Sequence, residues 1–447
     1  MKKSLICLGL SMLVGATTWA AEVKDVKSYV VQVPEEFYVE YSGAYQNNFP
    51  KGFEPGHGSA LALKRINEDG SIEFYGLSDR GPNADGPMIL NNPNKSGKIF
   101  PAPKFVPEIG VIKFVSGKAM VTEKIALRAG DSQKITGLPV IPGTTGATGE
   151  TALDDLMKVL PYDVNGMDPE GLAIDKEGNF WISDEYGPFV AKFSPEGKLL
   201  KKMMPGQGLP DILKYRTPNR GMEGLTITPS GKYLWGAMQS VLDIEGQTGK
   251  AGQFTRLVRI DIATGVTQMF AYPINSNYKN ASGAKIGDVY ALNDGELLLI
   301  EQGADRNGVM TNQIFKVSIG EATDLSNFKI NGLEAEFAVD TSALQMAEKE
   351  LLVDLRQHGW KIEKAEGITL LPDRKTIVVI NDNDFGLALS VKDNLLQKAK
   401  VTDYTFDNAK QQMMIDGKVR NPQINLSQNS PDEAHVQLWF IEMRDLL

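Results

Sequence analysis

A hairpin of one design recurs five times along this chain of 447 residues. In the central copy, 167–186, short apolar strands at 172–174 and 180–182 flank a turn whose Gly178 is free to adopt positive φ. The other copies lie at 58–82, 222–239, 287–303 and 365–386. Self-similarity of this kind, built from short strands and glycine turns, is typical of the blades of a β-propeller.

The strands that follow each hairpin predict an all-β propeller of four-stranded blades. The last strand, 436–442, is expected to pair beside the N-terminal strand at 29–33 and close the ring, which leaves no open sheet edge. Five copies plus this composite blade predict six blades, with five or seven as alternatives. One or two short helices are expected, at 151–159 and 340–356.

Two stretches rich in Pro, Gly and Asn or Thr, 83–107 and 128–162, interrupt the repeat. Loops of this length on a compact domain usually have a function. They are predicted to be lids or binding loops.

The first 20 residues have the composition of a secretory signal peptide. Lys2 and Lys3 precede an apolar run at 5–14, and small residues follow up to Ala20. The alternative, a membrane anchor, needs about 20 apolar residues, and this run is shorter. We therefore expect one propeller domain over 21–447, in a bacterial periplasm or secreted. Cys7 is the only cysteine, so the mature chain has no thiolate zinc site and no disulfide.

The charge of the chain limits its partners. The formal net charge is −9, and it becomes −11 when Lys2 and Lys3 are removed with the signal peptide. Such a protein is a poor nucleic-acid binder, whereas acidity suits a cation site. No later segment approaches a membrane span, and we expect a monomer that acts on a small anionic ester.

Carboxylates occupy one slot at the start of the first strand in four copies, and Ser59 occupies it in the first copy. The inner strands of a propeller line its channel, so these side chains should ring one mouth. Carboxylates this close repel one another unless a cation or an arginine lies among them, and an oxygen-only cluster suits Ca²⁺. The expected metal ligands come from these slots and from the ends of the second strands: Asp79, Glu170, Glu223, Asp288, Glu366 and Asp382.

Further residues are expected to act on the substrate. Glu223, Asp184 and Glu185 are the predicted catalytic groups. Guanidinium groups bind phosphate in a bidentate fork, so the expected substrate-binding residues are Arg80, Arg220 and, beside them, His57.

Each of these residues also has a purely structural interpretation. Each glutamate could instead pair with an arginine or cap backbone amides. The glycines that follow the slot, Gly171, Gly224 and Gly367, are expected to be backbone requirements of the inner strand, and Trp181 and Trp235 to fill space between blades. A serine-hydrolase elbow, a P-loop, a dinucleotide fingerprint and a His-Glu-x-x-His motif are all missing from the sequence.

Several motifs in order resemble the phytase-like domain family, labelled as having esterase-like activity of phytase. They are Leu77-Ser-Asp-Arg-Gly81, Asp168-Pro-Glu-Gly-Leu172, Trp181-Ile-Ser-Asp-Glu185, Asn219-Arg-Gly-Met-Glu-Gly-Leu225 and Glu366-Gly-Ile368. The resemblance spans roughly residues 55 to 390. It implies a secreted, calcium-dependent β-propeller that hydrolyses phosphate esters or other esters.

The residues and the resemblance together favour an exported, Ca²⁺-dependent hydrolase of phosphate esters or related esters. Two alternatives remain open at this point. One is a non-catalytic periplasmic binding or scaffold propeller with a structural cation, because propellers host many functions. The other is a calcium-dependent lactonase with the same acidic mouth.

Overall fold

The computed structural model describes residues 22–274 and 276–447, with the side chains of residues 93–95 left out. The predicted signal peptide lies outside the described residues. Within them the chain is all-β, as predicted, and every helix is a 3-10 turn of three to five residues. No helix of this part of the chain is long and apolar enough to cross a membrane.

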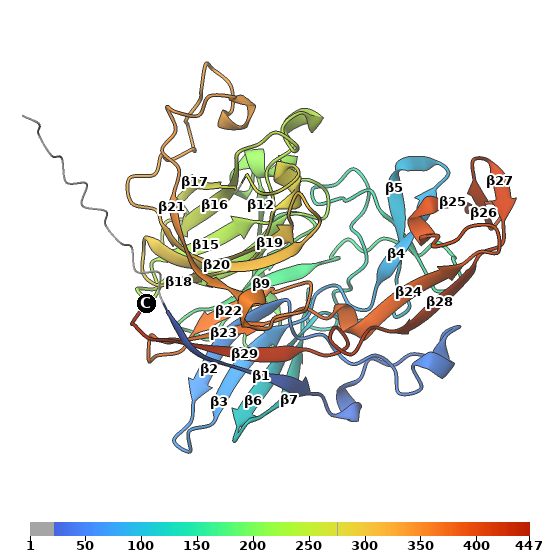
Figure 1. The fold of residues 1–447 in the computed structure, drawn as a ribbon, viewed down its shortest axis with the longest axis horizontal. Coiled ribbons are helices and arrows are strands. Elements are labelled where there is room, and N and C mark those ends of the chain that lie inside the picture. Colours follow the sequence, from blue (N-terminus) through green and yellow to red (C-terminus); the bar gives the residue numbers. More distant parts are fainter. Residues whose placement is uncertain (1–21, 275) are drawn as a thin grey trace, which may run out of the picture.

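Five four-stranded blades surround a central channel, and their inner strands β2, β9, β14, β18 and β22 contact one another in a closed ring (Figure 1). From the channel outwards, blade 1 consists of β2 (Ala60–Ile66), β3 (Ile72–Leu77), β6 (Glu108–Val115) and β7 (Lys118–Ala126). Blade 2 consists of β9 (Pro169–Ile174), β10 (Phe180–Asp184), β11 (Val190–Phe193) and β12 (Leu199–Pro205). Blade 3 consists of β14 (Met222–Ile227), β15 (Tyr233–Met238), β16 (Phe254–Asp261) and β17 (Thr267–Pro273). Blade 4 consists of β18 (Lys285–Ala291), β19 (Glu296–Ala304), β20 (Met310–Ser318) and β21 (Glu348–Asp354). Blade 5 consists of β22 (Gly367–Leu370), β23 (Thr376–Ile380), β29 (Gln437–Met443) and β1 (Val23–Gln32). A short strand, β13 (Gly208–Leu209), extends blade 2.

The ring closes as the sequence predicted, but the count of six blades is wrong. The C-terminal strand β29 pairs with β23 on one side and with the N-terminal strand β1 on the other. The fifth hairpin copy is therefore the inner half of the composite closing blade, and no sixth blade exists. The end of β1 also pairs with β7, at Val31 and Gln32, and so ties blade 5 to blade 1.

The two predicted helices are wrong as well. Residues 151–153 form strand β8 and the following residues form turns, while the second stretch supplies strand β21 and one 3-10 turn. The apolar residues of β21 read as a helical face in isolation. Pairing with β20 makes the segment a strand, in which Leu352 is buried and Leu351 is 40% exposed.

The core consists mainly of hydrophobic layers between neighbouring blades, one at each of the five blade junctions. Strands between two such layers are apolar on both faces, which explains the run Leu297-Leu-Leu-Ile300 in β19. Trp181 and Trp235 lie in these layers, as predicted, with exposed fractions of 6% and 0%.

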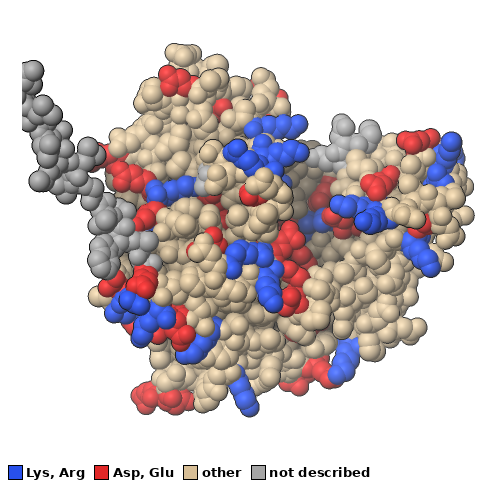
Figure 2. Space-filling view, viewed as in Figure 1, with Lys and Arg blue, Asp and Glu red and all other residues tan. Residues whose placement is uncertain are grey.

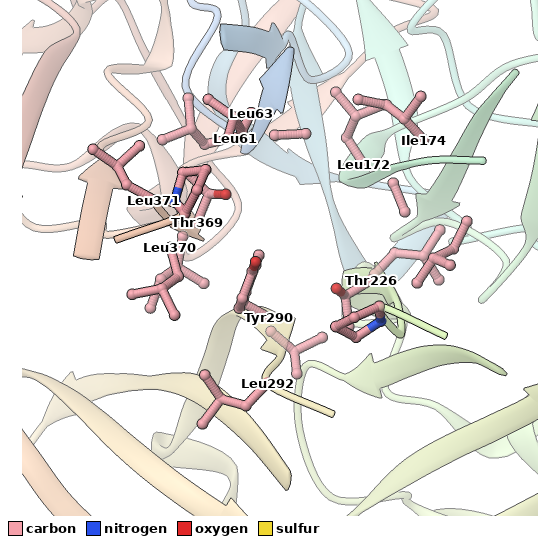
Figure 3. Close-up of a pocket in the computed structure, with 18 of the residues that line it drawn as sticks. Leu61, Leu63, Leu172, Ile174, Thr226, Tyr290, Leu292, Thr369, Leu370 and Leu371 are labelled. Carbon is pink, nitrogen blue, oxygen red and sulfur yellow. The ribbon is translucent and has the colours of Figure 1, made fainter. Parts of the chain in front are cut away.

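The inner strands approach one another at a layer of glycines, which confirms the expected backbone role. A Cβ on Gly224 would lie 2.6 Å from the Val289 nitrogen, and one on Gly367 would lie 2.7 Å from the Leu61 nitrogen. Beyond this layer the channel widens into a cavity of about 340 Å³ lined mainly by apolar residues of all five inner strands (Figure 3). The glycine layer thus separates an acidic mouth from an apolar one.

The predicted long loops form a separate lobe beside the propeller (Figure 1). They join residues inserted before β29 in one mixed sheet, in the order β27 (Lys418–Arg420), β26 (Gln412–Ile415), β25 (Thr405–Asp407), β4 (Ala84–Ile89), β5 (Asn92–Ile99), β8 (Thr151–Leu153). The pair β24 (Leu387–Lys392) and β28 (Gln423–Gln428) connects this lobe to blade 5.

The glycine layer gives a stability prediction. Gly224→Ala should lower the free energy of unfolding by about 1–3 kcal/mol, because the new methyl group meets backbone atoms of β18 that cannot move aside. Gly295→Ala is the matched control, since a Cβ there has nothing within 4 Å. Denaturant unfolding of both variants measures the difference, and equal stability would contradict the close approach of the strands.

Candidate functional site

Three glutamates from three blades meet at one mouth of the channel. Glu170 lies in β9, Glu223 in β14, and Glu366 directly before β22, each followed by a glycine of the close-packed layer. Their exposed fractions are 7%, 2% and 5%, and one carboxylate oxygen from each lies within 4.8 Å of the others. We call them the glutamate trio.

Two further acidic groups adjoin the trio. Asp168, Glu170 and Glu185 form one of them, so Glu170 belongs to both clusters. Asp79, Asp382 and Asp384 form the other. The sequence predicted Asp79 and Asp382 as metal ligands at this mouth, and the structure places the two residues together.

Burial raises the pKa values of Glu185 and of the glutamate trio. The pKa of Glu185 rises to about 8, first through burial and then through Asp168. The pKa of Glu366 also rises to about 8 through burial, with Asp382 adding to the shift against the opposing effect of Lys364. Glu170 and Glu223 have pKa values well above the ordinary range, because burial and neighbouring glutamates disfavour both charges.

Few groups compensate the trio itself. The Nε2 amide of Gln239 donates to Glu185 and to Glu223, at 2.8 Å each, and that of Gln302 lies 3.4 Å from Glu366. Glu170 has no hydrogen bond or ion pair within the described parts of the chain. The Oε1 atom of Gln239 is buried and has no partner there either. The cluster therefore offers oxygen atoms that a cation would satisfy.

Three basic residues lie near the trio: Lys364, Arg80, and Lys285, which opposes the rise in the pKa values of Glu223 and Glu366. Lys364 contacts Asp382 at 2.6 Å and Asp384 at 2.8 Å, and lies 3.9 Å from Glu366. This ammonium group already neutralises part of the aspartate cluster. Sequence reasoning missed it, although Lys364 precedes Glu366 by two residues, just as Asp168 precedes Glu170, and residues two apart on a strand share a face.

Arg80 is predicted to bind substrate, and it lies 6% exposed at the same mouth. Its guanidinium is 3.3 Å from Asp168 and 3.4 Å from Glu150, which comes from the inserted loop 128–162. It also donates to the Asn219 side chain at 3.2 Å. Arg80 thus links three segments and holds Asp168 in place.

The structure does not bring every predicted residue into the site. Asp288 stays outside the acidic groups, because the strand register places it level with Gly224 and Gly367, one residue beyond the predicted slot. Its Oδ2 accepts a hydrogen bond from the Ile368 amide at 2.9 Å and so ties β18 to β22. Asp184 is fully buried and accepts from the amides of Asp168 and Gly187, at 3.1 and 3.0 Å. It fixes the backbone that carries Asp168 and Glu185, and burial raises its pKa to about 7.

His57 and Arg220 are engaged with other partners. His57 is 1% exposed, packs against Gly76 and Gly110 of blade 1, and pairs with Glu108 at 3.2 Å. Such burial leaves little surface that a substrate could touch. Arg220 donates to the main-chain carbonyl of Ser282, on the segment that leads into β18.

Gln239 and Gln302 are contacts that the sequence reasoning missed. The signal was available in the repeat, since both occupy the slot at or near the end of the second strand that holds Glu185 and Asp382 in other copies.

Comparison with known proteins agrees with the motifs. The phytase-like family, described as having esterase-like activity of phytase, matches residues 56–385 and confirms the resemblance seen in the sequence. A protein of the fungus Arthroderma benhamiae, named "Uncharacterized secreted protein", is 25% identical over 338 residues, which cover 61% of this chain and 65% of that protein. The match therefore spans slightly less than two thirds of this relative.

Solved structures show only distant likeness. The catalytic domain of a Coprinopsis cinerea GH62 α-L-arabinofuranosidase is 8% identical with a TM-score of 0.35, and covers 93% of this chain and 97% of that one. A Podospora anserina α-L-arabinofuranosidase is 10% identical with a TM-score of 0.37, and covers 94% and 97%.

The ion pairs of Lys364 lead to a prediction. Lys364→Met should lower the free energy of unfolding by about 2 kcal/mol, less than the ~3–5 kcal/mol of a fully buried pair, because its side chain is 29% exposed. Adding Asp382→Asn should restore part of the loss. Lys361→Met, at a nearby exposed position, is the control for denaturant unfolding. An unchanged free energy of unfolding in Lys364→Met would show that the aspartates do not need this ammonium group.

The raised pKa values predict a pH dependence in chelator. A carboxyl whose pKa rises from 4.5 to about 8 on folding keeps its proton in the native state while the unfolded chain loses it. Stability should therefore fall as pH rises from about 5 to 8. We expect melting temperatures to fall by several degrees over this range, and less so in Glu366→Gln. A flat profile would mean that the trio is ionised and compensated at every pH.

Proposed function

Because the chain belongs to the phytase-like family, a family of hydrolase type, we propose that it is an exported hydrolase of phosphate esters or related esters that works at the acidic mouth with a bound Ca²⁺ ion. One observation carries the proposal. Three blades each contribute a buried glutamate to a cluster whose oxygens lie within 4.8 Å of one another.

The residues fit such a cation. Ca²⁺ binds six to eight oxygen ligands in flexible geometry, and a site of this kind needs no sulfur or nitrogen. Glu170, Glu223 and Glu366 would hold the ion, and the unpartnered Oε1 of Gln239 is available beside them. When bound, Ca²⁺ supplies polarisation of an ester oxygen.

The chain's own residues would then bind and orient the substrate. Lys364 is a partly exposed cation of the mouth, so its ammonium would bind an anionic oxygen. Arg80 holds Asp168, and Asp184 holds the backbone of Asp168, so both would act as positioning groups. Arg220 is engaged with Ser282, and we assign the anion to Lys364 instead.

Glu185 would act as the general acid. With a pKa of about 8 it is protonated near neutral pH, and Gln239 donates to its Oε1. Its proton would pass to the leaving oxygen of the ester, because general acids work best when their pKa lies near the working pH. Glu223 lies on the other side of Gln239 and would orient the attacking water and accept the proton that this water loses.

Export rests on separate support. The Arthroderma benhamiae relative is named as a secreted protein. The sequence of residues 1–20 predicts a signal peptide, and the mature chain has no cysteine. A bacterial periplasm or the exterior suits these properties.

The glutamate trio predicts that calcium stabilises the protein and that turnover needs it. A ligand that binds only the native state adds about 2.7 kcal/mol at a hundredfold excess over Kd. Chelator should lower the melting temperature by several degrees, and Ca²⁺ should restore it better than Mg²⁺, which prefers rigid octahedral shells. Glu223→Gln should remove this effect and reduce ester turnover at least a hundredfold, whereas Glu196→Gln, at an exposed turn, should change neither.

The assay should include phosphomonoesters, phosphodiesters, carboxyl esters and lactones. Turnover of lactones alone would identify a lactonase. Calcium stabilisation without turnover of any substrate would identify a non-catalytic binding propeller. A melting temperature that ignores both chelator and Ca²⁺ would overturn the cation site.

A further inference from the structure

A second cavity lies where the inserted lobe meets the propeller mouth. This cleft of about 560 Å³ lies between the hairpin β4–β5, inserted in blade 1, and the segments β24 and 399–402, inserted in blade 5. Its polar lining consists of Asn83, Asp85, Lys98, Asp384, Ser390, Lys400 and Thr402. Figure 2 shows a hollow between the two parts of the molecule, with acidic and basic side chains near it.

The cleft is continuous with the acidic mouth. Asp384 lines the cleft and also belongs to the aspartate cluster. Its carboxylate lies 2.8 Å from Lys364, which in turn lies 3.9 Å from Glu366 of the glutamate trio. A molecule held in the cleft could therefore present a bond to the mouth within the length of two side chains.

The backbone at this junction is strained. Asp384 and Phe385 have φ values of 47° and 55°, although neither is glycine, and Phe385 is a buried aromatic. Strain of this kind persists where the surrounding structure holds it and is concentrated at functional sites. The surrounding structure therefore holds Asp384 at the boundary between the cleft and the mouth.

The charges in the cleft select the kind of molecule that fits. Asp85 pairs with Lys98 at 2.9 Å, and Lys98 lowers the pKa of Asp85. Asp384 pairs with the Lys364 ammonium at 2.8 Å. Carboxylates held in such ion pairs accept hydrogen bonds and do not donate them.

Hydroxyl groups can donate hydrogen bonds to such acceptors, whereas ionised phosphate or carboxylate groups cannot. Ser390 and Thr402 add hydroxyls that can donate or accept. Leu387, Leu389 and Val391 give the same cleft an apolar wall. A lining of this mixture matches the hydroxyl edges and the carbon faces of a sugar or sugar alcohol.

We infer that this cleft binds the neutral, polyhydroxylated part of the substrate, a sugar or sugar alcohol, while the ester bond lies at the mouth. The inference rests on the proposed function only in placing the ester at the mouth. The binding itself can be measured without turnover, in chelator.

The test uses the full mature protein in chelator and three neutral probes, methyl glucoside, methyl galactoside and sorbitol, with glucose 6-phosphate as the anionic probe. Calorimetry or ligand-observed NMR gives the affinities. At least one neutral probe should bind with a millimolar or lower Kd, and more tightly than glucose 6-phosphate. Ser390→Trp should weaken it at least tenfold by filling the cleft, and Thr402→Val at least twofold.

Lys418→Trp places the same indole on β27, at the far edge of the inserted sheet, and should leave the affinity unchanged. Glu223→Gln should also retain probe binding, which separates this inference from the calcium site. Asp85→Asn should reduce the ratio of the Kd for glucose 6-phosphate to the Kd for the neutral probes. Absence of binding by all three neutral probes, tighter binding of glucose 6-phosphate, or unchanged affinity in both cleft variants would overturn the inference.

Discussion

The close approach of the five inner strands is the constraint on which the site depends. Glycines next to the slot allow neighbouring strands to approach until a single methyl group would collide with backbone. That approach places the residues just before the glycines side by side. Carboxylates in those slots are therefore held together by the same packing that stabilises the ring.

Repulsion among so many carboxylates raises the free energy of the folded state, and several kinds of contact offset it. Lys364 neutralises part of the aspartate cluster and Arg80 neutralises Asp168. Asp184 gives both oxygens to backbone amides, whereas Asp288 gives one, and its other oxygen is buried without a hydrogen-bond partner among the described residues. The glutamate trio keeps little compensation, with the Glu170 carboxylate lacking any partner among the described residues. This local concentration of uncompensated oxygen favours a cation there.

The inserted lobe turns this mouth into a more selective site. Its strands come from insertions in blades 1 and 5, which are neighbours only because the ring closes between them, and from the connection between blades 1 and 2. Glu150 from that connection reaches Arg80, and Asp384 from the insertion in blade 5 reaches Lys364. Recognition and chemistry are thereby placed on different structural parts, as is common where a rigid scaffold carries variable loops.

The sequence by itself determined the propeller class, the ring closure by the terminal strands, and the meeting of Glu170, Glu223 and Glu366, because these follow from a local repeat with a fixed register. Only the tertiary structure decided that there are five blades, since pairing of β1 with β29 makes the closing blade out of the fifth copy. It also decided which acids are free. Asp288 lies one residue beyond the slot of the trio, at the level of Gly224 and Gly367, and it binds the Ile368 amide. Lys364 neutralises Asp382. These contacts depend on the register and packing of neighbouring strands, which the repeat pattern does not specify.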